Sequence, residues 1–236
     1  MEQKAAKRFY KQADMVAIED GFGVHLDGRA LKSPAKAALI LPTEKMAQAV
    51  TSEFNDQQEE IVPDSMPIFS LASTVIDRIL PQRDTLDDEL VRYGLNDLIC
   101  YRADEAEDQS LAMKQQEEWG FIQTWLNDTY GVRLQHFSGV MPQSQPDEVA
   151  QKYPSIIAPI DSWSYVALYR VTTLSGSLAL GLAFRDEKLD VPSLMKQAFL
   201  DEYHQEEKWG ADEWAVERRD NIKTEFSDMS KFLKLL

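Results

Sequence analysis

The sequence contains a single cysteine, Cys100, among its 236 residues. One cysteine excludes an intrachain disulfide and favours a reducing compartment. The flanking segment DLICYRA is apolar and aromatic, so we expect a buried structural thiol rather than a reactive one. The three histidines, at positions 25, 136 and 204, have no metal-ligand spacing, and no metal site is expected.

Long apolar runs are also missing from the sequence. The longest, such as SLALGLAF, are far shorter than the roughly 20 residues that span a membrane. The first segment, MEQKAAKRFYKQ, has no apolar signal core. We therefore expect a soluble cytoplasmic protein with no membrane insertion.

Basic residues are scarce relative to acidic ones. There are 25 Lys and Arg residues against 40 Asp and Glu, which gives a formal net charge of −15. Binding to a phosphate backbone needs basic patches, so we expect no nucleic-acid partner. An acidic surface instead favours solubility, or contact with a basic partner surface.

Catalytic signatures are absent. The sequence has no GxSxG elbow, no GxGxxG turn, no GxxxxGK phosphate loop and no HExxH. We therefore expect no enzyme activity, no catalytic residues, no cofactor and no small-molecule substrate. One alternative is a small acid–base enzyme in which His204 works with nearby carboxylates, namely Asp201, Glu206 and Glu207. The competing interpretation is a solvated charged helix face.

Residues 1–42 show the near-alternating polarity of short β-strands. Turns are expected at residues 21–23 (Gly-Phe-Gly), at Asp27-Gly28 and at Ser33-Pro34. Thr43 is expected to cap a helix with one apolar stripe, Met46, Ala47, Val50 and Phe54. A proline-bounded connector over residues 61–67 then marks the predicted domain boundary.

From Ile68 onward the apolar residues recur with helical periodicity. We expect a helix that ends at Pro81, one over 110–130 with Gly131 as its stop, and others over 147–153, 161–172, 175–184 and 212–233. The fold class is therefore predicted to be α+β. A small N-terminal β-rich domain with one helix, residues 1–65, precedes a larger C-terminal α-helical domain, residues 66–236.

The most distinctive stretch is FLDEYHQEEKWGAD, residues 199–212. Trp209 and Gly210 close a helix, because glycine readily adopts the left-handed turn at a helix end. Asp212 is expected to cap the next helix. Glu202 and Glu206, four residues apart, share one side of the first helix. The residues alone predict that Trp209 is a packed structural aromatic.

Several short segments occur in the order typical of one known family. They are KRFYK (7–11), LDGR (26–29), SP (33–34), LPT (41–43), EFNDQ (53–57), MP (66–67), ID (76–77), Tyr93 with DL (97–98), CYR (100–102), GSL (176–178) and residues 202–210. With this ordered set, the chain resembles the ATP-twelve family, the assembly chaperones of the F-type ATP synthase catalytic head in mitochondria and alphaproteobacteria. One departure is Phe54, where the family usually has tryptophan.

The resemblance implies an N-terminal β-rich domain, a C-terminal helical domain and no catalysis or nucleotide use. It implies a molecular chaperone that binds the unassembled alpha subunit, shields its beta-contacting surface and promotes assembly of the head. The family's functionally important glutamate falls on Glu202 or Glu206, and with Trp209 these are the predicted partner-binding residues. The implied location is the bacterial cytoplasm, or the mitochondrial matrix in a eukaryote. An acidic protein-binding adaptor without chaperone activity is the alternative.

Overall fold

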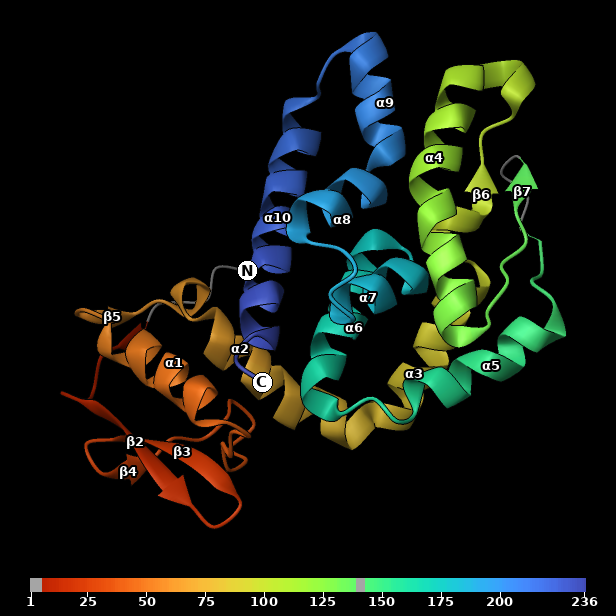
Figure 1. Ribbon diagram of the computed structural model, residues 1–236. Coiled ribbons are helices and arrows are strands. Elements are labelled where there is room, and N and C mark those ends of the chain that lie inside the picture. Colours follow the sequence, from red (N-terminus) through yellow and green to blue (C-terminus); the bar gives the residue numbers. More distant parts are fainter. Residues whose placement is uncertain (1–5, 139–142) are drawn as a thin grey trace. The chain divides into compact units, whose positions relative to one another are not determined.

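The computed structural model describes residues 6–138 and 143–236 (Figure 1). The chain forms two compact units. The first unit comprises residues 1–83 and 228–236, and the second unit comprises residues 84–227. Each unit is described separately below.

Short antiparallel strands form the β region of the first unit. β2, β3 and β4 make one sheet in that order, and β1 pairs with β5. The turn predicted at Asp27 and Gly28 is confirmed, with φ of 47° and 81° between β3 and β4. Residues 21–23, predicted as a turn, instead begin β3, where the main chain of Leu41 passes close to Gly21. The strands are β1 (Ala6–Lys7), β2 (Ala13–Ile18), β3 (Gly21–Leu26), β4 (Arg29–Ala30) and β5 (Glu60–Ile61).

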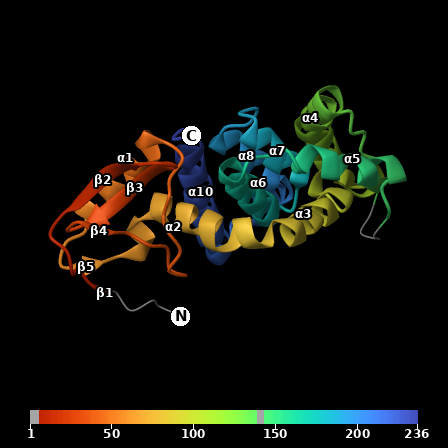
Figure 2. The ribbon, with the colours of Figure 1, turned by 90° about the horizontal axis from the view of Figure 1, so that it is seen from below.

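One helix, α1 (Glu44–Asn55), packs against β2 and β3 (Figure 2). The Thr43 side chain accepts a hydrogen bond from the Met46 backbone N–H at 3.2 Å, which satisfies a free donor of the first turn. The helix buries the predicted apolar stripe, Met46, Ala47, Val50 and Phe54. The cap and the stripe are therefore both confirmed.

The first unit extends beyond the predicted boundary at residues 65/66. After a 3-10 turn (Pro63–Ser65), α2 (Pro67–Thr74) begins against α1. The Glu53 carboxylate of α1 accepts the backbone N–H groups of Ile68 and Phe69 at 2.7 and 2.8 Å. The Phe54 and Phe69 rings also meet edge to face, with 5.0 Å between their centroids. These contacts hold the start of α2 within the first unit.

The helix predicted to end at Pro81 kinks one residue later, at Gln82, where two helical segments meet. A π-helical turn (Val75–Ile79) leads directly into α3 (Leu80–Leu95). Pro81 lies in the first turn of α3, where a proline is tolerated because an N–H there lacks a partner within its own helix. The backbone leaves helical geometry only at Gln82, with φ −123° and ψ 17°.

The second unit is almost entirely helical. All but one residue of α7 are buried, and α7 crosses α6 closely at Gly181, where a Cβ atom would collide with Thr172 and Leu168. Its elements are a 3-10 turn (Leu98–Cys100), β6 (Tyr101–Arg102) parallel to β7 (Phe137–Ser138), α4 (Glu105–Tyr130), α5 (Asp147–Ile157), α6 (Ser162–Ser175), α7 (Leu178–Arg185), α8 (Val191–Ala198), α9 (Leu200–Trp209) and α10 (Glu213–Leu233), whose last turns belong to the first unit.

Several local predictions for the second unit are confirmed, whereas several helix bounds differ. The helix predicted over 161–172 extends to Ser175, and the one predicted over 175–184 begins at Leu178. Gly131 ends α4 with φ 67°, and the Cys100 thiol is buried, which raises its pKa. α4 starts five residues before the predicted position 110 and leaves helical geometry at Asp108. α5 continues through Pro154 to Ile157, where the Ala158 N–H still donates to the Pro154 carbonyl.

Candidate partner-binding site on the α9–α10 hairpin

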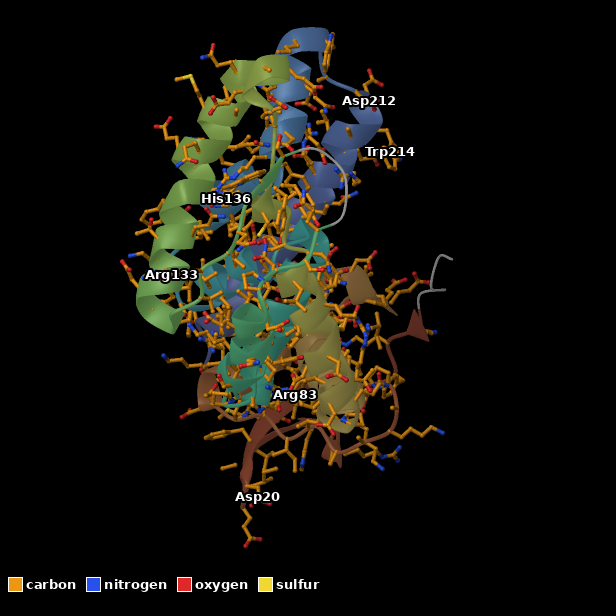
Figure 3. The ribbon with its side chains drawn as sticks, turned by 90° about the vertical axis from the view of Figure 1, so that its right-hand side faces the viewer. Asp20, Arg83, Arg133, His136, Asp212 and Trp214 are labelled. Atoms are coloured by element: carbon orange, nitrogen blue, oxygen red, sulfur yellow. The ribbon has the colours of Figure 1, made fainter. Side chains whose placement is uncertain are left out.

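The predicted site residues lie on the helical hairpin of α9 and α10. Phe199 separates α8 from α9 with φ −119° and ψ 25°, so α9 is a short helix of its own. Gly210, with φ 89°, ends α9 as predicted. The Asp212 carboxylate caps α10 by accepting from the Trp214 and Ala215 N–H groups at 2.8 and 3.1 Å. Figure 3 shows Asp212 and Trp214 at this end of the hairpin.

Glu202 and Glu206 are engaged inside the hairpin by two arginines of α10. Glu202 accepts from Arg218 at 2.6 Å and from Arg219 at 2.9 Å. Glu206 pairs with Arg219, whose side chain is only 5% exposed. Because a nearly buried guanidinium needs counter-charge, these glutamates hold α9 against α10.

Aromatic faces reinforce the same pairing. The Arg218 guanidinium lies 5.4 Å from the Phe199 ring centroid, and the Arg219 guanidinium lies 5.0 Å from that of Tyr203. Cations over aromatic faces add attraction, most strongly where water is excluded. The hairpin is thus a rigid support for the residues at its end.

Two tryptophans are exposed at the end of the hairpin. Trp209, the last residue of α9, is 77% exposed, and Trp214, in the first turn of α10, is 72% exposed. The interpretation of Trp209 as a packed aromatic is therefore wrong. Trp214 was not among the site residues predicted from the sequence, although its polar neighbours (ADEWAVERRD) favour an exposed position. Large exposed aromatic side chains are typical of protein contact sites.

Acidic side chains flank these tryptophans. Glu213, Glu217 and Asp220 line a shallow concavity of about 340 Å³ on α10, together with Val216. None of these three carboxylates has an ion-pair partner in the part of the chain that the structure describes. The hairpin end thus combines apolar area with unpaired negative charge.

His204 is buried, not part of a solvated charged face. It is 3% exposed, and its Nε2 lies 2.9 Å from Oδ2 of Asp108 in α4. Lys208 donates to the same oxygen at 2.5 Å. Chiefly this lysine, with the Leu111 N–H, holds the Asp108 pKa well below its usual range. The cluster ties α9 to α4 at the point where α4 is broken.

The carboxylates predicted to work with His204 are used elsewhere. Asp201 accepts from Gln115 at 2.8 Å, Glu207 pairs with Lys114 at 2.5 Å, and Glu206 pairs with Arg219. The carboxylate that pairs with His204 is therefore Asp108 of α4, not one from its own helix. The acid–base unit predicted from the sequence is not assembled.

Among residues 6–138 and 143–236, no three His, Cys, Asp or Glu side chains are grouped so that they could hold a metal ion. Within those ranges, no helix has both the length and the apolar character needed to cross a membrane.

Comparison with known proteins places the chain in a family. Residues 7–127 match the family described as ATP12 chaperone protein. The crystal structure of Atp12 from Paracoccus denitrificans is similar over 98% of both chains, with a TM-score of 0.92 and 34% identity. An Agrobacterium tumefaciens crystal structure, 31% identical with a TM-score of 0.90, covers 99% of this chain and 87% of that one. Mitochondrial protein atp12 of Schizosaccharomyces pombe is 24% identical over 91% of this chain and 77% of its own length. The predicted α+β fold is confirmed, and the chain belongs to the ATP12 chaperone family.

Proposed function

We propose that this chain binds the unassembled alpha subunit of the F-type ATP synthase, covers its beta-contacting surface and releases it during assembly of the catalytic head. The observation that carries the proposal is the exposed tryptophan pair on an ion-paired hairpin, in a chain of a chaperone family. An unassembled ring subunit exposes apolar interface that would aggregate. Apolar contact area with a polar rim can cover such an interface without an active site.

The hairpin residues have two different roles in this proposal. Trp209 and Trp214 contact the alpha subunit, because tryptophan contributes large contact area at interfaces. Glu202 and Glu206 act as positioning residues, since their carboxylates are used by Arg218 and Arg219. The compartment is the one in which the head is assembled, the bacterial cytoplasm or the mitochondrial matrix.

The tryptophans can be tested by titrating the purified chain with isolated alpha subunit. We expect the double variant Trp209→Ala/Trp214→Ala to bind at least about tenfold more weakly. Phe121→Ala is the matched control, because Phe121 is another exposed aromatic of the second unit, at 51%, but lies on α4. Failure of the wild-type chain to bind the alpha subunit would overturn the proposal. Equal binding by the double variant and the control would show that the two tryptophans do not contact the alpha subunit.

The glutamates need a separate test because they act through the arginines. Glu202→Lys and Glu206→Lys should both weaken alpha-subunit binding, since a lysine facing Arg218 or Arg219 repels the helix that the glutamate holds. Glu206→Gln should retain more binding than Glu206→Lys. Binding and head assembly at wild-type levels for both lysine variants would contradict any role of these residues.

An acidic adaptor for a basic partner is the second candidate. It is favoured by the second unit, which has 27 acidic and 13 basic residues, a net charge of −14. Binding through charge alone falls steeply as salt rises, whereas binding through apolar area persists. Alpha-subunit binding measured at about 0.05 M and 0.5 M salt separates the two candidates.

A further inference from the structure

The sheet of the first unit has one covered edge and one open edge. β2, β3 and β4 lie in that order, so β2 is an edge strand. On the β4 side, Phe22 of β3 also exchanges main-chain hydrogen bonds with Leu41, at 2.9 and 2.8 Å. On the other side, no strand pairs with β2 in the part of the chain that the structure describes. An unpaired strand edge is a template for the addition of another strand.

The register of β2 shows which of its main-chain groups point outward. Its antiparallel pairing with β3 runs without a bulge from Ala13 to Ile18. In such a pair, alternate residues exchange hydrogen bonds with the partner strand, and the residues between them point their N–H and C=O groups away from it. Ala13 points outward, because the Asn55 side chain of α1 accepts its N–H and donates to its C=O, both at 2.9 Å. The next outward residues are therefore Met15 and Ala17.

Met15 and Ala17 leave this edge unpaired. Within residues 6–138 and 143–236, neither residue has a hydrogen-bond partner on the outer side of β2. Ala17 is exposed and Met15 is half-buried. Proteins usually protect such an edge with a lysine, a proline or a bulge, and the strand sequence ADMVAI has none of these. The Asn55 amide, which bonds Ala13 as a neighbouring strand would, marks where the open stretch begins.

The unpaired groups specify an extended polypeptide as the occupant. Outward N–H and C=O groups two residues apart are matched by the main chain of another strand, and not by a helix or a hydrocarbon chain. A second copy of this chain fits less well, because the open strand is short. Two six-residue strands meet over roughly 20 Å, too little for the ~800 Å² that each partner of a stable dimer buries.

The charge beside the open edge favours a basic segment. Asp14, Glu19 and Asp20 are exposed, and Lys11 is the one basic residue of 11–20. Figure 3 shows the Asp20 side chain pointing away from the rest of the chain. In the described ranges, neither Glu19 nor Asp20 has an ion-pair partner. The first unit as a whole is nearly balanced, with 13 acidic and 12 basic residues, a net charge of −1. The acidic side chains at this edge therefore attract a segment that carries lysine or arginine and repel an acidic one.

We infer that the open edge of β2 binds an extended segment of the client polypeptide that carries lysine or arginine, and that this segment pairs with Met15 and Ala17 as an additional strand. The inference rests on the proposed function only for the identity of the client, the alpha subunit. Main-chain hydrogen bonds supply the affinity in this kind of binding, and the side chains of the added strand supply the selectivity.

The first test uses the full-length wild-type chain and overlapping 15-residue peptides that span the alpha subunit. Each peptide that binds is then N-methylated at one residue at a time. Methylation of an amide that faces β2 should weaken binding at least about tenfold, because a hydrogen bond is lost and the methyl group collides with the edge. Methylation of the amides between them should have little effect. No bound peptide, or a methylation scan without this two-residue alternation, would overturn the inference.

A proline at position 17 tests the edge from the side of the chain. Ala17→Pro removes the outward N–H without removing a bond to β3, and proline is tolerated on an edge strand where its nitrogen faces solvent. We expect it to weaken peptide binding about tenfold. Ala17→Val is the matched control, since it keeps the N–H and should bind as the wild type does. Equal binding by the two variants would overturn the inference. The methylation scan needs no variant, so it decides the question even if Ala17→Pro does not fold.

The basic character of the segment is tested with Glu19→Lys/Asp20→Lys. This double variant should bind the same peptides more weakly, and its binding should depend less on salt. Glu59→Lys/Asp64→Lys, which changes two exposed acidic residues of the same unit outside β2, is the control and should bind as the wild type does. Equal binding by the two double variants would contradict the selectivity for a basic segment. A homodimer that Ala17→Pro dissociates, with no peptide bound, would identify a second copy as the occupant and overturn the inference.

The outcomes for the strand edge and for the proposed function are distinguishable. Peptide binding with the two-residue alternation, without binding of the intact alpha subunit, supports the strand edge and contradicts the proposed function. Intact-subunit binding that the tryptophan variants weaken, with peptide binding insensitive to Ala17→Pro, contradicts the strand edge and leaves the proposed function standing.

Discussion

The two units differ in charge and in the kind of surface they expose. The first unit is nearly neutral, with a net charge of −1, and leaves one edge of its sheet open. The second unit has a net charge of −14 and exposes two tryptophans on a hairpin whose glutamates are paired internally. Whole-chain composition conceals this difference. Acidic residues can keep the exposed tryptophans soluble in the second unit, whereas the charges of the first unit are nearly balanced.

A large loss of stability is expected when a buried carboxylate is removed from the interior of the second unit. Asp97 is fully buried and accepts from the Ile99 and Ala179 N–H groups at 3.2 and 2.9 Å. Asp97→Ala should cost about 2–5 kcal/mol of unfolding free energy, because two buried donors lose their acceptor. Urea denaturation of the wild type and the variant measures this difference in unfolding free energy. The control is Asp190→Ala, an exposed cap that bonds the Ser193 N–H, which should cost about 1 kcal/mol. Equal losses would contradict the role of burial.

A smaller effect is expected in the hairpin itself. Arg219→Ala removes a nearly buried guanidinium that bonds Glu202 and Glu206, and should cost roughly 1–3 kcal/mol because both glutamates are partly solvated. Arg218→Ala should cost less, since Arg218 is 35% exposed and pairs with Glu202 alone. Denaturation of both variants under identical conditions checks the order. A larger loss for Arg218→Ala would show that the pairing with Glu206 is unimportant.

A pH effect is expected in the first unit. Burial raises the pKa of Glu53 to about 7, against the opposing hydrogen bonds from Phe69 and Ile68. The folded state therefore retains a proton that the unfolded chain releases near its ordinary pKa. Stability from this group is fully present below about pH 4.5 and is lost as the pH rises through about 7.

Glu53→Gln should flatten this pH dependence. The wild type should lose roughly 1–2 kcal/mol more than the variant between pH 5 and pH 8, after allowance for partial solvation. Denaturant midpoints across this pH range provide the measurement. Parallel profiles for the two proteins would show that Glu53 titrates normally in the folded state.

The smallest stability effect is expected at the exposed tryptophans. Trp209→Ala and Trp214→Ala should each change the unfolding free energy by less than about 0.5 kcal/mol, because both side chains lie largely in solvent. Buried Trp119→Ala, on α4 of the same unit, should cost about 3–5 kcal/mol. A large loss at Trp209 or Trp214 would mean that these residues stabilise the fold, which would weaken their assignment to partner contact.

Much of the local structure could be predicted from the sequence. Thr43 and Asp212 cap helices where their side chains were expected to do so, and Gly131 ends α4. Such features depend on atoms within a few residues of one another, so their spacing is visible in the chain. The ordered family segments also indicated the α+β fold, which the matching structures confirm.

Only the tertiary structure decided which groups meet. His204 lies against Asp108, 96 residues earlier in the chain. Glu53 bonds the start of α2, although the proline-bounded connector between them was predicted to be a domain boundary. Sequence spacing placed Glu202 and Glu206 on one helix side but could not reveal that this side faces Arg219. Periodicity predicts a helix and its polar face, because both arise from short-range hydrogen bonds and burial. The neighbour of that face depends on how distant segments pack, and the same packing left Trp209 and Trp214 in solvent.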